Sequence, residues 1–157
     1  MNAAPLGTLL AMLPPQAHAK TVHNPAQLFD PAPYGFSHVT SVPAGGRLVF
    51  VAGQGGEEDR QGKLTPDFRA QVRQALRNVQ TALRSQGVEM GAVVKVTTLV
   101  VDHDAARLQV IIEEFERMWP AKDFPVNTLI PVPRLALDGM LVEIDAVAVA
   151  SARPPAR

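Results

Sequence analysis

The sequence predicts one α+β domain in which two helices pack on one face of a mixed β-sheet, in the order β-β-α-β-α-β-β. Two segments carry apolar residues at helical spacing, and five shorter runs are dense in valine and other apolar residues, which is typical of strands. Helical crossovers join parallel strands and hairpins join antiparallel ones, so we expect a mixed sheet. The face without helices needs a cover, and a second subunit is the simplest one.

Turn residues separate the five expected strands. The strands cover residues 36–42, 48–52, 93–101, 126–132 and 141–150. Pro43-Ala44-Gly45-Gly46 supplies turn chemistry for a hairpin between the first two. Gly53-Gln54-Gly55-Gly56 follows the second strand and lacks the spacing of a phosphate-binding loop, so we interpret it as a point of close backbone packing.

The first helix is predicted to begin at Thr65 as N-cap, with Pro66 in the first helical position, and to end at Gly87. Its apolar stripe comprises Phe68, Val72, Ala75, Leu76, Val79, Ala82 and Leu83. A row of arginines falls mostly off this stripe, at Arg69, Arg73, Arg77 and Arg84. Such a row could bind nucleic acid, but 15 basic residues balance 15 acidic ones, so we expect a solvated helix face and no nucleic-acid partner.

The second helix is predicted over residues 105–119, with Asp102 as its N-cap. Its solvated side is expected to carry Glu113, Glu114 and Glu116, which are therefore not interpreted as paired catalytic carboxylates. Asp102-His103-Asp104 could in principle bind a metal ion. Adjacent residues at a strand-to-helix turn seldom converge on one ion, so we expect a structural role for them.

Composition excludes several other functions. The chain has no cysteine, which rules out disulfides, thiol catalysis and thiolate metal sites. Its four histidines lack metal-ligand spacing, and we expect no metal site. No apolar run approaches the roughly 20 residues that span a bilayer, so we expect no membrane partner.

The ends of the chain are expected to lie outside the domain, which we assign to residues 31–150. Residues 1–30 are predicted to be an extension, either disordered or containing a signal peptide, because an A-x-A pattern precedes Lys20. A cytoplasmic location is expected in the first case and a periplasmic or exported one in the second. Residues 151–157 are predicted to be a flexible tail.

Glu143 is the candidate catalytic residue. In the last strand Val142 and Ile144 are expected to point into the core, and Glu143 and Asp145 to the opposite face. A carboxylate in so apolar a strand is costly to bury unless it is paired. Two interpretations stay open: a general acid or base, or a rim carboxylate that lies on an edge strand or pairs with an arginine such as Arg134.

Five stretches, spread in order over residues 21–150, resemble the RidA family, also called YjgF or L-PSP endoribonuclease. They are FSHV from Phe36, LVFVAGQ from Leu48, AQVRQAL from Ala70, VVKVT from Val93 and VEIDAVAV from Val142. The resemblance implies a chorismate-mutase-like fold and a homotrimer with small-molecule clefts between subunits. It also implies a deaminase, a hydrolase of C–N bonds that converts reactive enamines and imines to ketoacids and ammonia without a cofactor or metal.

In the best-known members an arginine holds the substrate carboxylate and a glutamate on the last strand positions or activates water. Glu143 matches the glutamate, but the substrate-binding positions depart from the family pattern. Asn127 stands where the arginine is expected, with Thr128 after it; Phe36 replaces a tyrosine and Ala52 a serine. A bidentate arginine–carboxylate contact contributes about 1.5–3 kcal/mol. The usual 2-imino acids are thus expected to bind poorly unless Arg134 or another subunit supplies the cation.

Three functions follow from these observations. The first is an imine or enamine deaminase with an altered substrate, in which Glu143 acts on water. The second is a trimer that binds a small molecule without catalysis. The third is the ribonuclease or translation-inhibitor activity of older family names, which the neutral charge and the lack of a histidine-based acid–base pair disfavour.

Overall fold

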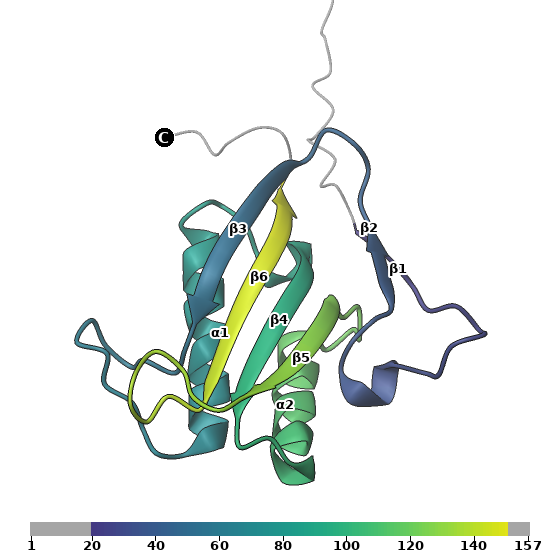
Figure 1. The fold of residues 1–157 in the computed structure, drawn as a ribbon. Coiled ribbons are helices and arrows are strands. Elements are labelled where there is room, and N and C mark those ends of the chain that lie inside the picture. Colours follow the sequence, from purple (N-terminus) through teal and green to yellow (C-terminus); the bar gives the residue numbers. More distant parts are fainter. Residues whose placement is uncertain (1–19, 151–157) are drawn as a thin grey trace, which may run out of the picture.

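A computed structural model describes residues 20–150, and these form a four-stranded sheet with two helices on one face (Figure 1). The strand order is β3-β6-β4-β5, with β4 and β5 parallel and β6 antiparallel to both β3 and β4. The elements of this layer are β3 (Arg47–Gln54), α1 (Phe68–Arg84), β4 (Val93–Val101), α2 (Ala105–Met118), β5 (Val126–Val132) and β6 (Val142–Ala150). The predicted α+β class, the mixed sheet and the two helices on one face are confirmed.

The first predicted strand differs from the expectation. It is shortened to β2 (Val39–Ser41), which pairs with an unpredicted strand, β1 (Thr21–His23), in a separate two-stranded sheet. The expected hairpin between β2 and β3 is therefore wrong, and the antiparallel pairs arise because β6 lies between β3 and β4. The β1–β2 sheet is held to the main sheet by side-chain hydrogen bonds and not by strand pairing between the two sheets. The Lys20 ammonium and the Thr40 hydroxyl donate hydrogen bonds to carbonyls at the start of β4.

The predicted extension comprises residues 1–30. Its described part, residues 20–30, contains the paired strand β1. The proposed signal peptide before Lys20 and the tail at 151–157 lie outside the described residues. Two short 3-10 helices complete the chain, at Ala32–Tyr34 and Met90–Ala92. Between residues 20 and 150, no helix is both long and apolar enough to cross a membrane.

Both helix N-caps lie two residues after the predicted ones. Asp67 caps α1 by accepting a hydrogen bond from the Ala70 amide at 2.7 Å, while the Thr65 hydroxyl accepts one from the Asp67 amide instead. Asp104 caps α2 through the Arg107 amide, also at 2.7 Å. Asp102 cannot serve as the cap because its φ of 47° lies in the left-handed region, whereas an N-cap is extended.

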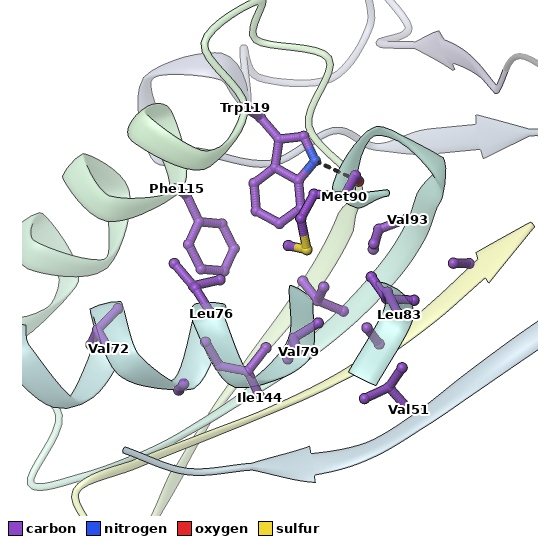
Figure 2. Packing of buried hydrophobic residues seen from close by; sticks show 14 of the residues in the cluster. Val51, Val72, Leu76, Val79, Leu83, Met90, Val93, Phe115, Trp119 and Ile144 are labelled. Atoms are coloured by element: carbon purple, nitrogen blue, oxygen red, sulfur yellow. Dashed lines mark hydrogen bonds between the residues drawn. The ribbon is translucent and has the colours of Figure 1, made fainter. Parts of the chain in front are cut away.

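The core lies between the sheet and the helices (Figure 2). Phe115 and Trp119 pack at a centroid distance of 5.4 Å, and both are almost fully buried. The Trp119 indole donates a hydrogen bond to the Met90 carbonyl at 3.2 Å, which satisfies the one polar atom of this side chain. α2 is thereby anchored to the turn that precedes β4, and Figure 2 shows Phe115 beside Leu76 of α1.

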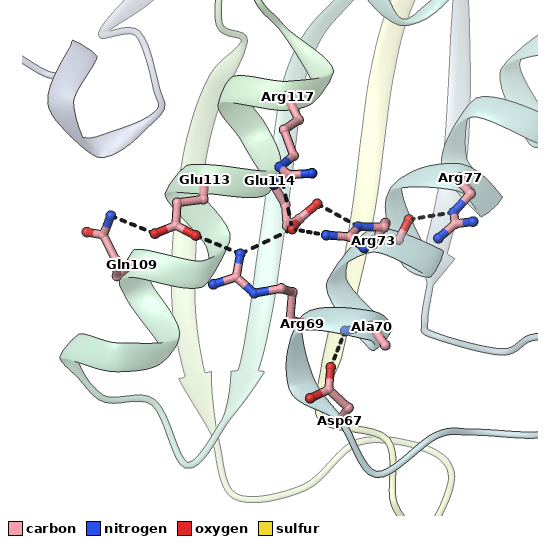
Figure 3. Close-up of polar contacts among 9 residues, drawn as sticks. All are labelled: Asp67, Arg69, Ala70, Arg73, Arg77, Gln109, Glu113, Glu114 and Arg117. Carbon is pink, nitrogen blue, oxygen red and sulfur yellow. Dashed lines mark hydrogen bonds and ion pairs between the residues drawn. The ribbon is translucent and has the colours of Figure 1, made fainter.

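The outer surface of the helix layer carries an ion cluster, and the prediction that Glu114 is solvated is wrong. Glu114 is 3% exposed. Arg73 donates to both of its carboxylate oxygens, at 3.0 and 2.7 Å, and Arg69 bridges Glu113 at 2.6 Å and Glu114 at 3.2 Å (Figure 3). The reason is tertiary: Glu114 lies on the side of α2 that faces α1, so the arginines of α1 cover it.

This cluster predicts a loss of stability in acid. Hydrogen bonds from Arg73 hold the pKa of Glu114 below its usual 4.5, and those from Arg69 and Gln109 do the same for Glu113. A lowered folded-state pKa stabilises the native state above the unfolded-state value, and this contribution disappears as the pH falls through the folded-state value. In urea unfolding, the difference in stability between wild type and Glu114→Gln should be full at pH 7 and shrink below about pH 4.5. A difference independent of pH would contradict the assignment.

Candidate functional site

Glu143 lies on the sheet face that carries no helices. Its neighbours Val142 and Ile144 on β6 are fully buried beneath the helices, whereas Glu143 and Asp145 are half-buried on the opposite face, as predicted. The ladder places Glu143 opposite Leu99 of β4. Glu143 is thus a half-buried carboxylate beside an apolar residue, on the sheet face that carries no helices.

Gly53 on β3 makes the space that the Glu143 carboxylate occupies. A Cβ atom on Gly53 would overlap Oε1 of Glu143 and would lie 2.6 Å from its Cδ and 2.8 Å from its Cγ. The ladder between β3 and β6 is also irregular between Val51 and Gln54, as at a β-bulge. The interpretation of this glycine-rich segment as close backbone packing is confirmed, and its closest contact is the candidate catalytic carboxylate.

Two other predicted site residues lie on the same open face. Ala52 is exposed on β3, next to the strand position of Gly53. Thr128 is exposed on β5 and pairs with Thr97, which in turn pairs with Asp145 of β6. Thr128 is therefore two strand spacings, about 10 Å, from β6.

Asn127 lies on the other face of the sheet. It pairs in the ladder with Val96, which is fully buried beneath the helices, and its Oδ1 accepts a hydrogen bond from the fully buried Thr98 hydroxyl at 3.1 Å. Side chains of paired residues point to the same face, so Asn127 and Glu143 point to opposite faces. One chain therefore does not bring these two predicted site residues together.

Arg134 and Phe36 are also apart from Glu143 within one chain. Arg134 follows β5, is 76% exposed and lies 3.5 Å from Asp138, so the interpretation of Glu143 as its ion-pair partner is wrong. Phe36 packs edge-to-face with Phe29 and His38, at centroid distances of 5.9 and 5.5 Å. This aromatic group lies at the outer edge of the sheet, because Ser37 bridges Val126 at the start of β5.

Gln71 supports the site, and sequence reasoning did not single it out. It is fully buried in α1, where its amide nitrogen donates to the carbonyls of Thr65 and Gly139 and its oxygen accepts from the Leu141 amide. The hydrogen bonds at Gly139 and Leu141 fix the turn that leads into β6, two residues before Glu143. The sequence did contain a signal for this role: Gln71 is a polar residue at a position of the helix where the spacing of the stripe predicts an apolar one.

Among residues 20–150, no group of three or more histidine, aspartate or glutamate side chains is placed to hold a metal ion. In the Asp102-His103-Asp104 segment, the Asp104 side chain has a structural role, because it caps the N-terminus of α2. The open face carries two half-buried carboxylates, Glu143 and Asp145, and Asp145 accepts a hydrogen bond from the Thr97 amide at 2.9 Å.

Comparison with known proteins shows the family to which the chain belongs. The family model described as Endoribonuclease L-PSP matches residues 30–150. The chain is 34% identical over 105 residues to a 2-iminobutanoate/2-iminopropanoate deaminase of Salmonella typhimurium. The aligned region covers 66% of this chain and 80% of that protein.

Solved structures show the same likeness. A protein of unknown function of the conserved Rid family, YyfB from Yersinia pestis, superimposes with a TM-score of 0.77 at 34% identity. The superposition covers 83% of this chain and 98% of the YyfB chain. Escherichia coli TdcF with bound serine gives a TM-score of 0.59 at 26% identity, over 68% of this chain and 87% of its own. The chain therefore belongs to the RidA family, the family of the Endoribonuclease L-PSP model.

Proposed function

We propose that the protein hydrolyses reactive imines or enamines. In this reaction water adds to the carbon of a C=N bond, the carbon keeps the water oxygen as a carbonyl group, and the nitrogen leaves as ammonia. Relatives at about one-third identity bear the name of 2-iminobutanoate/2-iminopropanoate deaminases, which supports this reaction class. The observation that carries the proposal is the half-buried Glu143 carboxylate seated against Gly53 on an open sheet face.

Glu143 is proposed to position the attacking water and to accept its proton. A carboxylate beside an apolar residue such as Leu99 is less well solvated than one in bulk water, which strengthens its interaction with a bound water. Gly53 leaves the carboxylate accessible from the β3 side and sets its direction. The carboxylate then returns the proton to the leaving nitrogen.

The substrate is proposed to carry less negative charge than a 2-imino acid. Asn127 offers only a neutral amide, and its oxygen is already engaged by Thr98. Phe36 and Ala52 replace hydroxyl-bearing residues, which makes the surroundings less polar. Arg134 is the alternative cation, since its 76% exposed side chain makes only a long contact with Asp138.

A complete site is proposed to need more than one copy of the chain, as in the homotrimer that the family resemblance implies. Glu143 and Asn127 point to opposite faces of one sheet, so a cleft that contains both must combine two subunits. The open face also carries exposed apolar side chains, among them Phe50 at 73% and Leu48 at 56% exposed, which a neighbouring subunit would cover.

The Glu143→Ala variant tests the proposed reaction. A threonine dehydratase generates 2-iminobutanoate in situ, and release of 2-oxobutanoate is followed with and without the protein. We expect wild type to accelerate release and Glu143→Ala to lose about 10²–10⁴-fold of that acceleration. Asp145→Asn is the matched control on the same strand face, since an amide oxygen can still accept the hydrogen bond of the Thr97 amide. Equal rates for Glu143→Ala and wild type would overturn the proposed role.

Asn127→Arg tests the altered substrate preference. An arginine at this position restores a bidentate contact to a carboxylate, so we expect kcat/KM for 2-iminobutanoate to rise by about tenfold or more. The rise should appear mainly in KM, because the contact holds the substrate rather than the transition state. An unchanged KM would show that the missing cation does not limit these substrates.

A non-catalytic binding protein is the second candidate, and the uncharged Asn127 favours it. It predicts no acceleration for any imine, combined with a thermal shift on addition of carboxylates or amino-acid analogues. Acceleration that depends on Glu143 would exclude this candidate.

A further inference from the structure

A small cavity lies between α1 and α2, on the helix surface away from the sheet. Its volume is about 220 Å³. Three residues of each helix line it, at spacings i, i+3 and i+4: Arg73, Leu76 and Arg77 from α1, and Glu114, Arg117 and Met118 from α2. Residues at this spacing share one helix face, so the two triplets face each other across the seam.

The charges around this cavity do not balance. Three guanidinium groups and one carboxylate line it, which leaves two positive charges. Glu114 already accepts three hydrogen bonds, because Arg73 donates to both of its oxygens and Arg69 donates to one. Arg69 is itself compensated by Glu113 at 2.6 Å, so this outer pair adds no net charge.

Arg77 and Arg117 are the two lining cations that make no hydrogen bond to a carboxylate within residues 20–150. The Nε atom of Arg117 is 4.0 Å from Glu114, beyond hydrogen-bond distance, and its side chain is 68% exposed. Arg77 makes one long hydrogen bond, 3.4 Å, to the Arg73 carbonyl, and forms no ion pair with any residue between 20 and 150. Figure 3 shows Arg117 close to Glu114, and Arg77 on the far side of Arg73 from Arg69.

The floor of the cavity is apolar. Leu76 is 1% exposed at the base of the seam, and Met118 lines the opposite side. A ligand matched to this surface has a doubly charged anionic group for Arg77 and Arg117 and a small apolar body for the floor. The cavity is smaller than the roughly 300–1,000 Å³ typical of drug-sized ligands, so the ligand is small.

We propose that this seam is a binding site for a small phosphate monoester with an apolar body, separate from the Glu143 site. Arg77 and Arg117 bind the phosphate oxygens, for which their planar donor groups are suited, and Leu76 and Met118 contact the apolar body. Arg73 holds the Glu114 carboxylate with two hydrogen bonds, which leaves the guanidinium donors of Arg77 and Arg117 for the ligand.

Titration calorimetry with phenyl phosphate tests the site in the full-length protein. We expect saturable binding of one molecule per chain with a dissociation constant of about 1 mM or lower at low salt. Inorganic phosphate lacks the ring and benzoate lacks the second charge, so each should bind at least about threefold more weakly. No saturable binding of phenyl phosphate up to about 10 mM would overturn the proposal, and so would equal affinity for all three ligands.

The double variant Arg77→Gln/Arg117→Gln assigns the binding to this seam. It should weaken phenyl phosphate binding by about tenfold or more. Arg84→Gln is the matched control, because Arg84 is an exposed arginine of the same helix that pairs with Glu89 outside the cavity, and it should change affinity by less than about twofold. Equal affinity in the double variant and wild type would contradict the assignment. Unaltered thermal unfolding would show that both variants remain folded.

The two proposed sites can be distinguished in one set of proteins. Glu143→Ala should lose imine hydrolysis and keep phenyl phosphate binding, and Arg77→Gln/Arg117→Gln should do the reverse. Loss of phenyl phosphate binding in Glu143→Ala would contradict a separate site on the helix layer.

Discussion

Replacing Gly53 with alanine is expected to lower the rate of imine hydrolysis by about 100-fold or more. The new methyl carbon would lie within 2.8 Å of the Cγ and Cδ atoms of Glu143, closer than non-bonded carbons approach, so the carboxylate must move away. A displacement of about 1 Å is enough to misalign a catalytic group by this factor. The effect should appear in kcat, since the variant still carries the carboxylate but directs it elsewhere. Steady-state release of 2-oxobutanoate measures it.

Gly91→Ala is the matched control for this substitution. A Cβ atom on Gly91 would meet nothing within 4 Å, and its backbone is not left-handed, so this variant should keep wild-type activity and stability. Urea unfolding of both variants separates a local shift of Glu143 from general destabilisation. Wild-type activity in Gly53→Ala would contradict the role of this glycine in directing Glu143.

Removing Arg73 is expected to destabilise the fold more than removing Glu114, although the two residues form one ion pair. The reason is the difference in burial, because the Glu114 side chain is 2% exposed and that of Arg73 is 42% exposed. Arg73→Ala leaves the buried carboxylate with Arg69 as its remaining hydrogen-bond donor and Arg117 at 4.0 Å, so we expect a cost of about 3 kcal/mol, the low end for a buried charge that loses a partner. Glu114→Ala leaves arginines that water can reach, so we expect a smaller loss, about 2 kcal/mol. Urea unfolding at pH 7 and fixed protein concentration measures both.

A double-mutant cycle tests the explanation. If the buried carboxylate causes the cost, Arg73→Ala/Glu114→Ala should be more stable than Arg73→Ala alone, because the buried charge that has lost its main partner is gone. Arg84→Ala serves as the exposed control, since Arg84 and Glu89 are both more than half exposed and their pair should contribute less than about 1 kcal/mol. Additive losses in the double variant would contradict the explanation.

The helices could be predicted from sequence because their signals are local. The stripe from Phe68 to Leu83 has helical spacing, and five of its residues, Val72 and Leu76 among them, are buried as that spacing requires. The alternation along β6 likewise placed Glu143 on the face opposite Ile144. Both inferences depend only on the periodicity of one element.

The remaining features depend on how elements meet. β1 pairs with β2, about 20 residues later in the chain. β1 is only three residues long and has no distinctive hydrophobic pattern, so its pairing could not be predicted from the sequence. Glutamate on a helix is usually exposed to solvent. Glu114 is buried because two arginines of α1 cover it. Asn127 could be aligned with a family motif, but the face to which it points follows from its ladder position beside Val96.

Hydrolysis of an imine by water that Glu143 activates is most directly tested by the decay of the imine itself. The decay rate of 2-iminobutanoate is compared with wild type, with Glu143→Gln and without protein, at equal chain concentrations. Glutamine keeps the shape of the side chain but cannot accept a proton, so we expect wild type alone to shorten the lifetime of the imine and Glu143→Gln to retain about 1% or less of that acceleration. An imine lifetime that is the same in wild type and Glu143→Gln would contradict catalysis by this carboxylate.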